Sequence, residues 1–293
     1  MLLMLKNDPQ NRRQGILELH SAILLLGLAG LFGKFLTLSP LVIVFGRAAF
    51  ASVALGLVML WIRRSADFPA IWPSKWVTVS GALLAIHWVA FFQAIQVSTV
   101  AVGLLPFSSF PLFVTLLEPC FFQERRRRLD LLTAALVVAG VSLIVPSFDL
   151  HNNITQGAFW GILSGLVYAV LCILNRRLLV TQSALTLTAG QNLAACLVLL
   201  PLVLWNGAVP SPREILLLAV LGVVCTALAH YLFIRSLSFV RAQLASVVTA
   251  LESVYAIFFA ALLLGEVPGV RTLLGGAVIL GAVVVATLGR HQR

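Results

Sequence analysis

The chain has 293 residues, of which 60% are hydrophobic and only 10% are charged, and its mean hydropathy is +1.04. A soluble domain carries about 25% charged residues, so a water-soluble fold could not hide this much apolar surface. The formal net charge of +10 would suit a nucleic-acid-binding protein, but the basic residues lie mostly in short connections between apolar runs, which argues against that function.

Ten apolar runs follow one another along the chain, and a membrane-spanning helix needs about 20 mostly apolar residues. The predicted helices cover residues 15–37, 40–62, 76–97, 100–122, 129–147, 157–179, 184–206, 214–236, 242–264 and 270–289. The connections between them are short and hold residues typical of loops. No connection is long enough for a second domain, so function must reside in the helical bundle or at its rims.

The second half of the chain repeats the first at a displacement of 142 to 144 positions. The equivalent positions include Lys34 and Arg176, His87 and His230, and the pairs Gln123-Glu124 and Gly265-Glu266. The two repeats, 15–147 and 157–289, each contain five predicted helices. Because five is odd, the repeats must lie in the membrane with opposite orientations. Such an inverted repeat is typical of secondary transporters, whose substrate site lies between the halves.

The basic residues indicate how the chain is oriented. If the N-terminal segment 1–14 is cytoplasmic, 16 of the 20 Lys and Arg residues lie on the cytoplasmic side, as the positive-inside rule requires. The four arginines at 125–128 are interpreted as a topology anchor. We expect both termini in the cytoplasm and the protein in the plasma membrane, which in a bacterium is the inner membrane.

Glu252 is the acidic group placed deepest in the predicted membrane. It lies near the middle of the ninth predicted helix, without a Lys or Arg within two helical turns, and Tyr255 shares its helix face. An apolar environment disfavours the charged form of a carboxyl, and a proton-coupled carrier could use this behaviour. The alternative is a neutral, hydrogen-bonded glutamate with a structural role.

Two basic side chains are further candidates for the substrate cavity. Arg47 lies about 10 Å into the second predicted helix, where it must pair with an acid, reach the interface or face a water-filled cavity. It could bind an anion or hold exposed carbonyls of neighbouring helices. Gln191 occupies the equivalent position of the second repeat, and Lys34 lies near the far rim of the first helix, at the expected mouth of the cavity.

Two histidines occupy equivalent positions in the third and eighth predicted helices. Each is followed by an aromatic residue, in the pairs His87-Trp88 and His230-Tyr231, and the aromatic residues Trp88, Tyr231 and Tyr255 are candidates for the substrate cavity. Histidine titrates near neutral pH, so a proton relay is conceivable, although a single His on an apolar helix is more often a packing residue. Thr226 precedes His230 by four residues and is expected to be its local partner.

The fourth predicted helix contains several helix breakers: Pro106, Ser108, Ser109 and Pro111. Proline removes a hydrogen bond of the helix and kinks it. Broken helices near the middle of the membrane often form the binding site of a carrier, so Ser109 is a candidate for the cavity.

The sequence contains no pattern for a disulfide, a metal site or a catalytic centre. Its four cysteines stand alone inside apolar runs, without CxxC or His/Cys spacing, so neither a metal nor a cofactor is expected. No Ser/His/Asp set and no HExxH motif is present, so we do not expect an enzyme. A membrane-embedded enzyme acting on lipid is the alternative of a different class.

At these residues the chain resembles the drug/metabolite transporter superfamily, and specifically its EamA family. The resemblance covers nearly the whole chain. The matching features are the Gly-Glu ending of a fourth helix, the arginine of the second helix and a Leu-Glu-Pro segment divided between the repeats: Gly265-Glu266, Arg47, Leu251-Glu252 and Pro111.

The resemblance implies an all-α membrane protein of ten helices, in which the first four helices of each repeat surround a central cavity. The fifth and tenth helices would be peripheral and could support a homodimer. Members resembling this chain export amino acids, related metabolites or drugs, and some import them. We therefore expect a secondary transporter that moves an amino acid or a related compound outward by alternating access, with a proton as the candidate coupling ion. Uptake or exchange of an organic anion, favoured by Arg47 and Lys34, is the alternative.

Overall fold

The structure is a computed structural model that describes residues 9–61, 74–122, 128–145, 149, 151–236, 239, 248–249 and 251–288. The basic run at 125–127, the Gln123-Glu124 pair and the first residues of the ninth predicted helix therefore lie outside the described residues. Within the described part of the chain the secondary structure consists of helices and turns. The all-α prediction is confirmed.

The helices correspond one to one with the predicted apolar runs, except that two of the runs are divided. In chain order they are α2 (Pro9–Phe35), α3 (Pro40–Trp61), α5 (Lys75–Val97), α6 (Val100–Phe107), α7 (Phe110–Phe122), α8 (Arg128–Ile144), α9 (Asn153–Leu178), α10 (Ala184–Asn206), α11 (Pro212–Gly222), the π-helix η2 (Val223–Leu228), α12 (Ala229–Ser236), α14 (Leu251–Leu264) and α15 (Val270–Leu288). The fourth run forms α6 and α7, and the eighth forms α11, η2 and α12.

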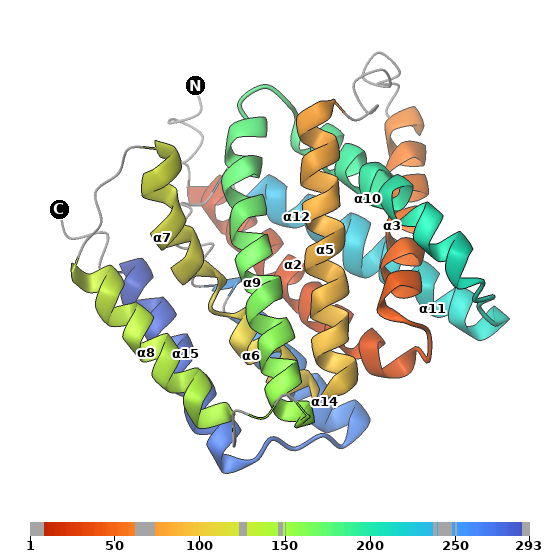
Figure 1. The fold of residues 1–293 in the computed structure, drawn as a ribbon. Coiled ribbons are helices and arrows are strands. Elements are labelled where there is room, and N and C mark those ends of the chain that lie inside the picture. The colour runs from red at the N-terminus through yellow and green to blue at the C-terminus, as the bar shows by residue number, and fades with distance from the viewer. Residues whose placement is uncertain are drawn as a thin grey trace.

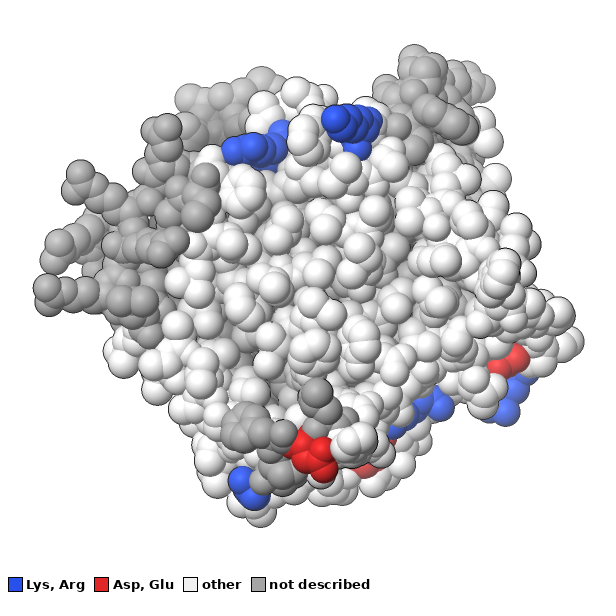
Figure 2. Space-filling view, viewed as in Figure 1, with Lys and Arg blue, Asp and Glu red and all other residues white. Residues whose placement is uncertain are grey.

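Six helical stretches of the described residues are long and apolar enough to cross a membrane: α2, α3, α5, α9, α10 and the column α11–η2–α12. The other four columns are shorter apolar helices, in α6–α7, α8, α14 and α15. On the face shown in Figure 2, Lys, Arg, Asp and Glu lie at the upper and lower borders, and a broad uncharged band separates them. This distribution matches a protein that crosses a bilayer many times.

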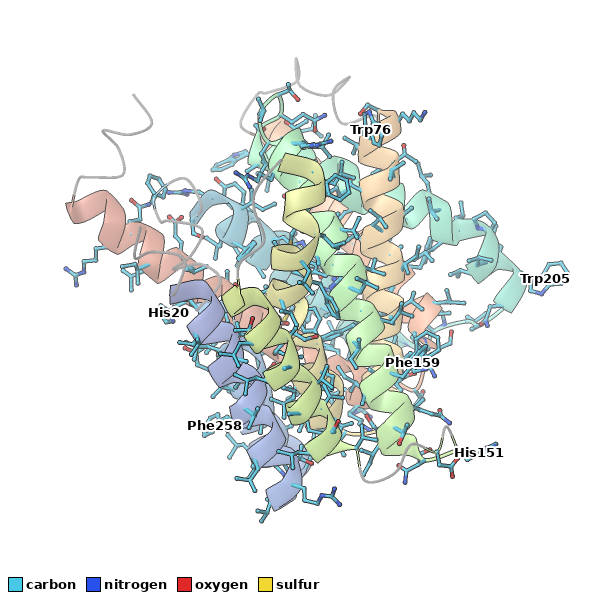
Figure 3. The ribbon with its side chains drawn as sticks, turned by 60° about the vertical axis from the view of Figure 1, so that its left-hand side comes forward. His20, Trp76, His151, Phe159, Trp205 and Phe258 are labelled. Carbon is cyan, nitrogen blue, oxygen red and sulfur yellow. The ribbon has the colours of Figure 1, made fainter. Side chains whose placement is uncertain are left out.

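Tryptophans mark the ends of several helices. Trp61, Trp76 and Trp205 are 84%, 58% and 93% exposed, and Figure 3 shows Trp76 and Trp205 at the outer limits of α5 and α10. Trp61 and Trp205 are equivalent residues of the two repeats. Tryptophan is enriched where a helix leaves the hydrocarbon, because its ring suits the boundary between lipid and water.

Contacts between helices relate the two halves by a pseudo-two-fold axis. The first helix of the first half, α2, packs against α12 and α14 of the second half. The first helix of the second half, α9, packs in the same way against α5 and α6 of the first half. α5 and α6 are the repeat equivalents of α12 and α14. Two further contacts join equivalent helices directly, α3 with α10 and α8 with α15. Figure 1 shows α8 beside α15 at the lower left and α3 beside α10 at the right. The halves are therefore interlocked rather than juxtaposed, and the fold is the inverted repeat that the sequence predicts.

Close approach of backbones at glycine holds the halves together. A Cβ on Gly81 of α5 would lie 2.5 Å from the Cβ of Ala194 on α10, and one on Gly161 of α9 would lie 2.5 Å from the carbonyl oxygen of Gly103 on α6. Small residues are favoured between membrane helices because they let backbones approach. α8 and α15 pack on each other at one edge of the bundle, and the homodimer expected through them stays a prediction.

Candidate functional site

A small cavity lies between the two halves. Its lining residues are Leu26, Ala29, Arg47, His87, Trp88, Phe91, Phe107, Tyr168, His230 and Glu252. They come from α2, α3, α5 and α6 of the first half and from α9, α12 and α14 of the second half. The space open to the centre of a water molecule is about 30 Å³, which suits a few waters rather than a metabolite.

Arg47 is the basic group of the cavity, and only 2% of its surface is exposed. Its Nε–H donates to the hydroxyl of Thr226 at 3.0 Å. Its guanidinium carbon lies 3.9 Å from the ring centre of Trp88 and 5.5 Å from that of Phe92. Arginine stacks well on aromatic faces, so the charge is held by a ring on one side and by a hydroxyl at its edge.

Glu252 reaches the same cavity from the first turn of α14 and is 8% exposed. Its neighbour Ser253 donates to the carbonyl of Leu104 at 3.1 Å and bonds the hydroxyl of Ser108 at 2.5 Å, which ties α14 to the break between α6 and α7. On the other side, a Cβ on Gly27 of α2 would lie 3.1 Å from the carbonyl oxygen of Glu252. Both neighbouring helices therefore fix where the carboxyl lies.

The carboxyl of Glu252 has no hydrogen bond or ion pair to any described residue. Arg47 lines the same cavity, and the ion pairs found among the described residues do not join it to Glu252. A buried carboxyl and a buried guanidinium that face one small space without contact can be bridged by water or by a ligand.

The two histidines line the cavity from α5 and α12. Nδ1 of His87 lies 2.8 Å from the hydroxyl of Ser164 and 3.2 Å from its carbonyl oxygen, so this imidazole is anchored to α9. The ring of His230 lies 5.4 Å from that of Trp88. Trp88 thus contacts both His230 and the guanidinium of Arg47.

Aromatic rings form the remaining wall. Tyr168 of α9 lies 4.7 Å from His87 and 5.8 Å from Phe107, and Phe107 lies 5.6 Å from Phe91, between ring centres. None of these three aromatic residues was predicted for the site from the sequence. Tyr168 is the repeat equivalent of Leu26, which also lines the cavity, but the sequence by itself marks neither residue as facing the interior.

Five of the residues predicted for the site meet in this cavity: Arg47, His87, Trp88, His230 and Glu252. The other five lie elsewhere. Ser109 donates to the carbonyl of Pro106 at 2.6 Å and closes the break in the fourth helix. Gln191 donates to Asn175 at 2.5 Å. Tyr231 packs on an apolar cluster of α3 and α10.

Tyr255 and Lys34 also lie outside the cavity. The hydroxyl of Tyr255 is 3.4 Å from Nδ1 of His20 on α2. Lys34 ends α2 at a rim of the bundle, where it donates to the carbonyl of Ser98 at 2.6 Å and lies 3.7 Å from Glu266. Lys34 is therefore bound to protein groups and is not directed into the cavity.

The expected pairing of Thr226 with His230 is wrong. Thr226 lies in η2, where its hydroxyl donates to the carbonyl of Leu221, five residues earlier, at 2.8 Å and accepts from Arg47. A π-helical turn contains one residue more than an α-helical turn. Spacing rules for an α-helix therefore do not apply across it.

Comparison with known proteins agrees with this arrangement. The model of the EamA-like transporter family matches residues 13–145 and 155–288, once in each half. The chain belongs to the EamA-like transporter family. It is accordingly a multi-pass membrane transporter.

Individual relatives are similar over most of the chain. An uncharacterized transporter of Bacillus subtilis, YxxF, is 23% identical over 98% of this chain and 95% of its own length. An uncharacterized transporter of Archaeoglobus fulgidus is 30% identical over 67% of this chain and 70% of its own. The pseudopaline exporter CntI of Pseudomonas aeruginosa is 28% identical over 85% of this chain and 86% of its own. A solved crystal structure shares the fold, with a TM-score of 0.68 and 18% identity over 96% of this chain and 100% of that chain.

Proposed function

We propose that this EamA-family transporter exports an amino acid or a related small carboxylate by alternating access. The observation that carries the proposal is the meeting of Arg47 and Glu252 in one buried cavity between the inverted halves. Similarity to the pseudopaline exporter CntI supports the outward direction.

The chemistry of the cavity suits a small zwitterion. A guanidinium donates to a carboxylate, and an ionised carboxyl accepts from an ammonium group. Aromatic rings of Trp88, Phe107 and Tyr168 offer an apolar surface between these charges. Arg47 and Glu252 do not bond to each other, so a substrate that carries both charges would supply a partner for each of them. An organic anion would supply a partner for Arg47 alone.

The small volume of the cavity supports a closed conformation. Ion pairs join the halves at both rims, because Lys34 of α2 pairs with Glu266 after α14 and Glu18 of α2 pairs with Arg235 of α12 at 3.0 Å. A substrate of several heavy atoms would need the helices to separate at one rim before it could enter. Alternating access requires that the two rims separate in turn.

At the rim that holds Lys34, hydrogen bonds and an ion pair join the end of α2, the segment between α5 and α6, and the segment that follows α14. Gly265 ends α14 with a φ of +68°, a conformation that favours glycine, and the chain then turns back. Glu266 there accepts from the backbone N–H of Val100 at 2.9 Å, at the first turn of α6, and pairs with Lys34, which also bonds Ser98. We propose this network as the external gate of the carrier, and it gives the Gly-Glu segment a role.

Neutralising the gate should open the cavity to the outside. A partly exposed ion pair contributes about 0.5–1 kcal/mol, so Lys34→Gln or Glu266→Gln should raise external access about two- to fivefold. The measurement is the rate at which the thiol introduced by Ala29→Cys reacts with a membrane-impermeant thiosulfonate, in a chain whose four native cysteines are replaced by Ala. Arg271→Gln, an exposed charge on the same proposed side, is the control and should leave the rate unchanged. Unchanged rates in both gate variants would contradict the gate.

The orientation follows from the basic residues and stays a proposal. We expect a reporter fused after Arg293 to be active in the cytoplasm and one inserted in the connection 207–211 to be active outside. Finding the two reporters on the same side, or in exchanged positions, would show that the assignment of the rims is wrong.

A transport screen tests the proposed function. Purified protein is reconstituted in liposomes, and efflux of each of the twenty ¹⁴C-labelled L-amino acids is measured with and without a pH gradient. The proposal expects movement of at least one amino acid that depends on Arg47. Movement of simple dicarboxylates in place of amino acids would favour the organic-anion alternative.

A further inference from the structure

The π-helix of the eighth column lies beside Arg47. η2 begins directly after Gly222 of α11, and a Cβ on Gly222 would lie 2.8 Å from the carbonyl oxygen of Arg47 and 2.5 Å from the Cβ of Phe50. Only a glycine permits this approach of two backbones. π-Helical turns in α-helices frequently occur at functional sites, and here the turn follows a close contact between the eighth column and α3.

The widened turn determines what the hydroxyl of Thr226 can do. It donates its single proton to the carbonyl of Leu221 at 2.8 Å. A hydroxyl has one proton and two lone pairs, so toward Arg47 it can only accept. The 3.0 Å contact with Nε is therefore a directed hydrogen bond from the guanidinium to the threonine, and Thr226 itself is fully buried.

Thr226 and Trp88 together fix the plane and the direction of the guanidinium. Trp88 covers one face at 3.9 Å, and Thr226 occupies the donor on the side edge. No hydrogen bond from either terminal nitrogen of Arg47 to a described residue is found, and Arg47 lines the cavity. The pair of donors at the end of the guanidinium is thus left for a ligand.

This arrangement has no counterpart at the equivalent positions of the other repeat. Gln191 stands at the equivalent of Arg47, and Leu83 stands at the equivalent of Thr226. The pseudo-two-fold symmetry of the fold is therefore broken at the centre of the cavity. Because Arg47 has no equivalent in the second repeat, a carboxylate that binds it can lie in the cavity in one orientation.

We infer that Thr226 is a positioning residue that holds Arg47 so that its two terminal nitrogens bind the carboxylate of the substrate side by side. The inference rests on the proposed function and assigns the carboxylate, rather than any other group of the substrate, to Arg47. A guanidinium and a carboxylate match in this bidentate geometry. Loss of the hydroxyl frees Nε–H of Arg47, and the guanidinium can then rotate away from the orientation in which both terminal nitrogens face the carboxylate.

Matched variants separate positioning from folding. Thr226→Val keeps the shape and removes the hydroxyl, Thr226→Ser keeps the hydroxyl, and Thr188→Val in α10 removes a buried hydroxyl that donates to Ala184 in its own helix at 2.8 Å. The probes are the labelled L-amino acid that the wild-type carrier moves fastest and the amide of that amino acid, which has no carboxylate.

Thr226→Val should raise the KM for the amino acid about tenfold, because a rise of that size corresponds to the free energy of one hydrogen bond to a charged group. The KM for the amide and the maximal rate should stay nearly unchanged. Thr226→Ser and Thr188→Val should behave as wild type. Equal loss for acid and amide in Thr226→Val, or the same loss in Thr188→Val, would overturn the inference.

A spectroscopic measurement tests the positioning without a substrate. The emission of Trp88 is obtained as the difference between each variant and its Trp88→Phe counterpart. Displacement of the guanidinium from the ring should shift this emission in Thr226→Val and not in Thr226→Ser. If no amino acid is transported, the proposed function fails while a shifted emission still supports the positioning; an unshifted emission in Thr226→Val contradicts it.

Discussion

Arg47→Gln is expected to raise the KM for a carboxylated substrate at least about tenfold, because a hydrogen-bonded charge pair contributes about 1.5–3 kcal/mol. Glutamine stands at the equivalent position of the second repeat, as Gln191 in α10, so the fold accepts an amide there. KM is measured by efflux from proteoliposomes, and thermal unfolding of the detergent-solubilised protein reports on folding.

Arg47→Lys is the matched variant for this prediction. Lysine keeps the positive charge but lacks Nε–H for Thr226 and cannot bind a carboxylate with two parallel hydrogen bonds. We expect an intermediate KM, below that of Arg47→Gln and above that of the wild type. A wild-type KM in Arg47→Gln would remove Arg47 from the substrate site.

Glu252→Gln is expected to impair transport or to abolish its pH dependence while the protein still folds. Glutamine preserves the size and shape of the side chain but cannot gain or lose a proton. The carboxyl lies 8% exposed in the cavity without a hydrogen bond to a described residue, so protonation can follow changes in access to water. The measurement is the rate of efflux across pH 5.5–8.5, in the wild type and in the variant.

Glu214→Gln is the control for the pH profile. Glu214 lies at the start of α11, where it caps its own helix and bonds Thr37 at 2.8 Å, away from the cavity. Its replacement should leave the profile unchanged. A wild-type rate and a wild-type pH profile in Glu252→Gln would show that Glu252 has a structural role and does not couple transport to protons.

Much of the fold could be predicted because the bilayer restricts what a sequence can do. A membrane-spanning segment must be apolar and helical, so composition alone locates the helices, and an odd number of helices per repeat determines the inverted arrangement. The same restriction located part of the cavity. Arg47, Glu252 and His87 are costly in lipid, and their depth in the predicted helices indicated that they face the interior.

The remaining residues of the site have no such signal. Phe91, Phe107 and Tyr168 are as compatible with lipid as with a cavity, so only their three-dimensional neighbours distinguish the two. Thr226 was recognised, but its partner was not. The π-helical turn begins beside the contact of Gly222 with α3, a tertiary interaction that local spacing does not contain.

Solute counterflow shows whether this protein is a carrier whose substrate binds at Arg47 and Glu252. Proteoliposomes are loaded with an excess of an unlabelled L-amino acid and diluted into a trace of the same labelled compound. We predict that the wild type transiently accumulates label above equilibrium, that Arg47→Gln does not at the same concentration, and that Glu252→Gln accumulates less or loses its pH dependence. Counterflow of unchanged extent and pH profile in both variants would show that the substrate does not bind at Arg47 and Glu252, and no counterflow with any of the twenty amino acids would show that the protein does not carry an amino acid.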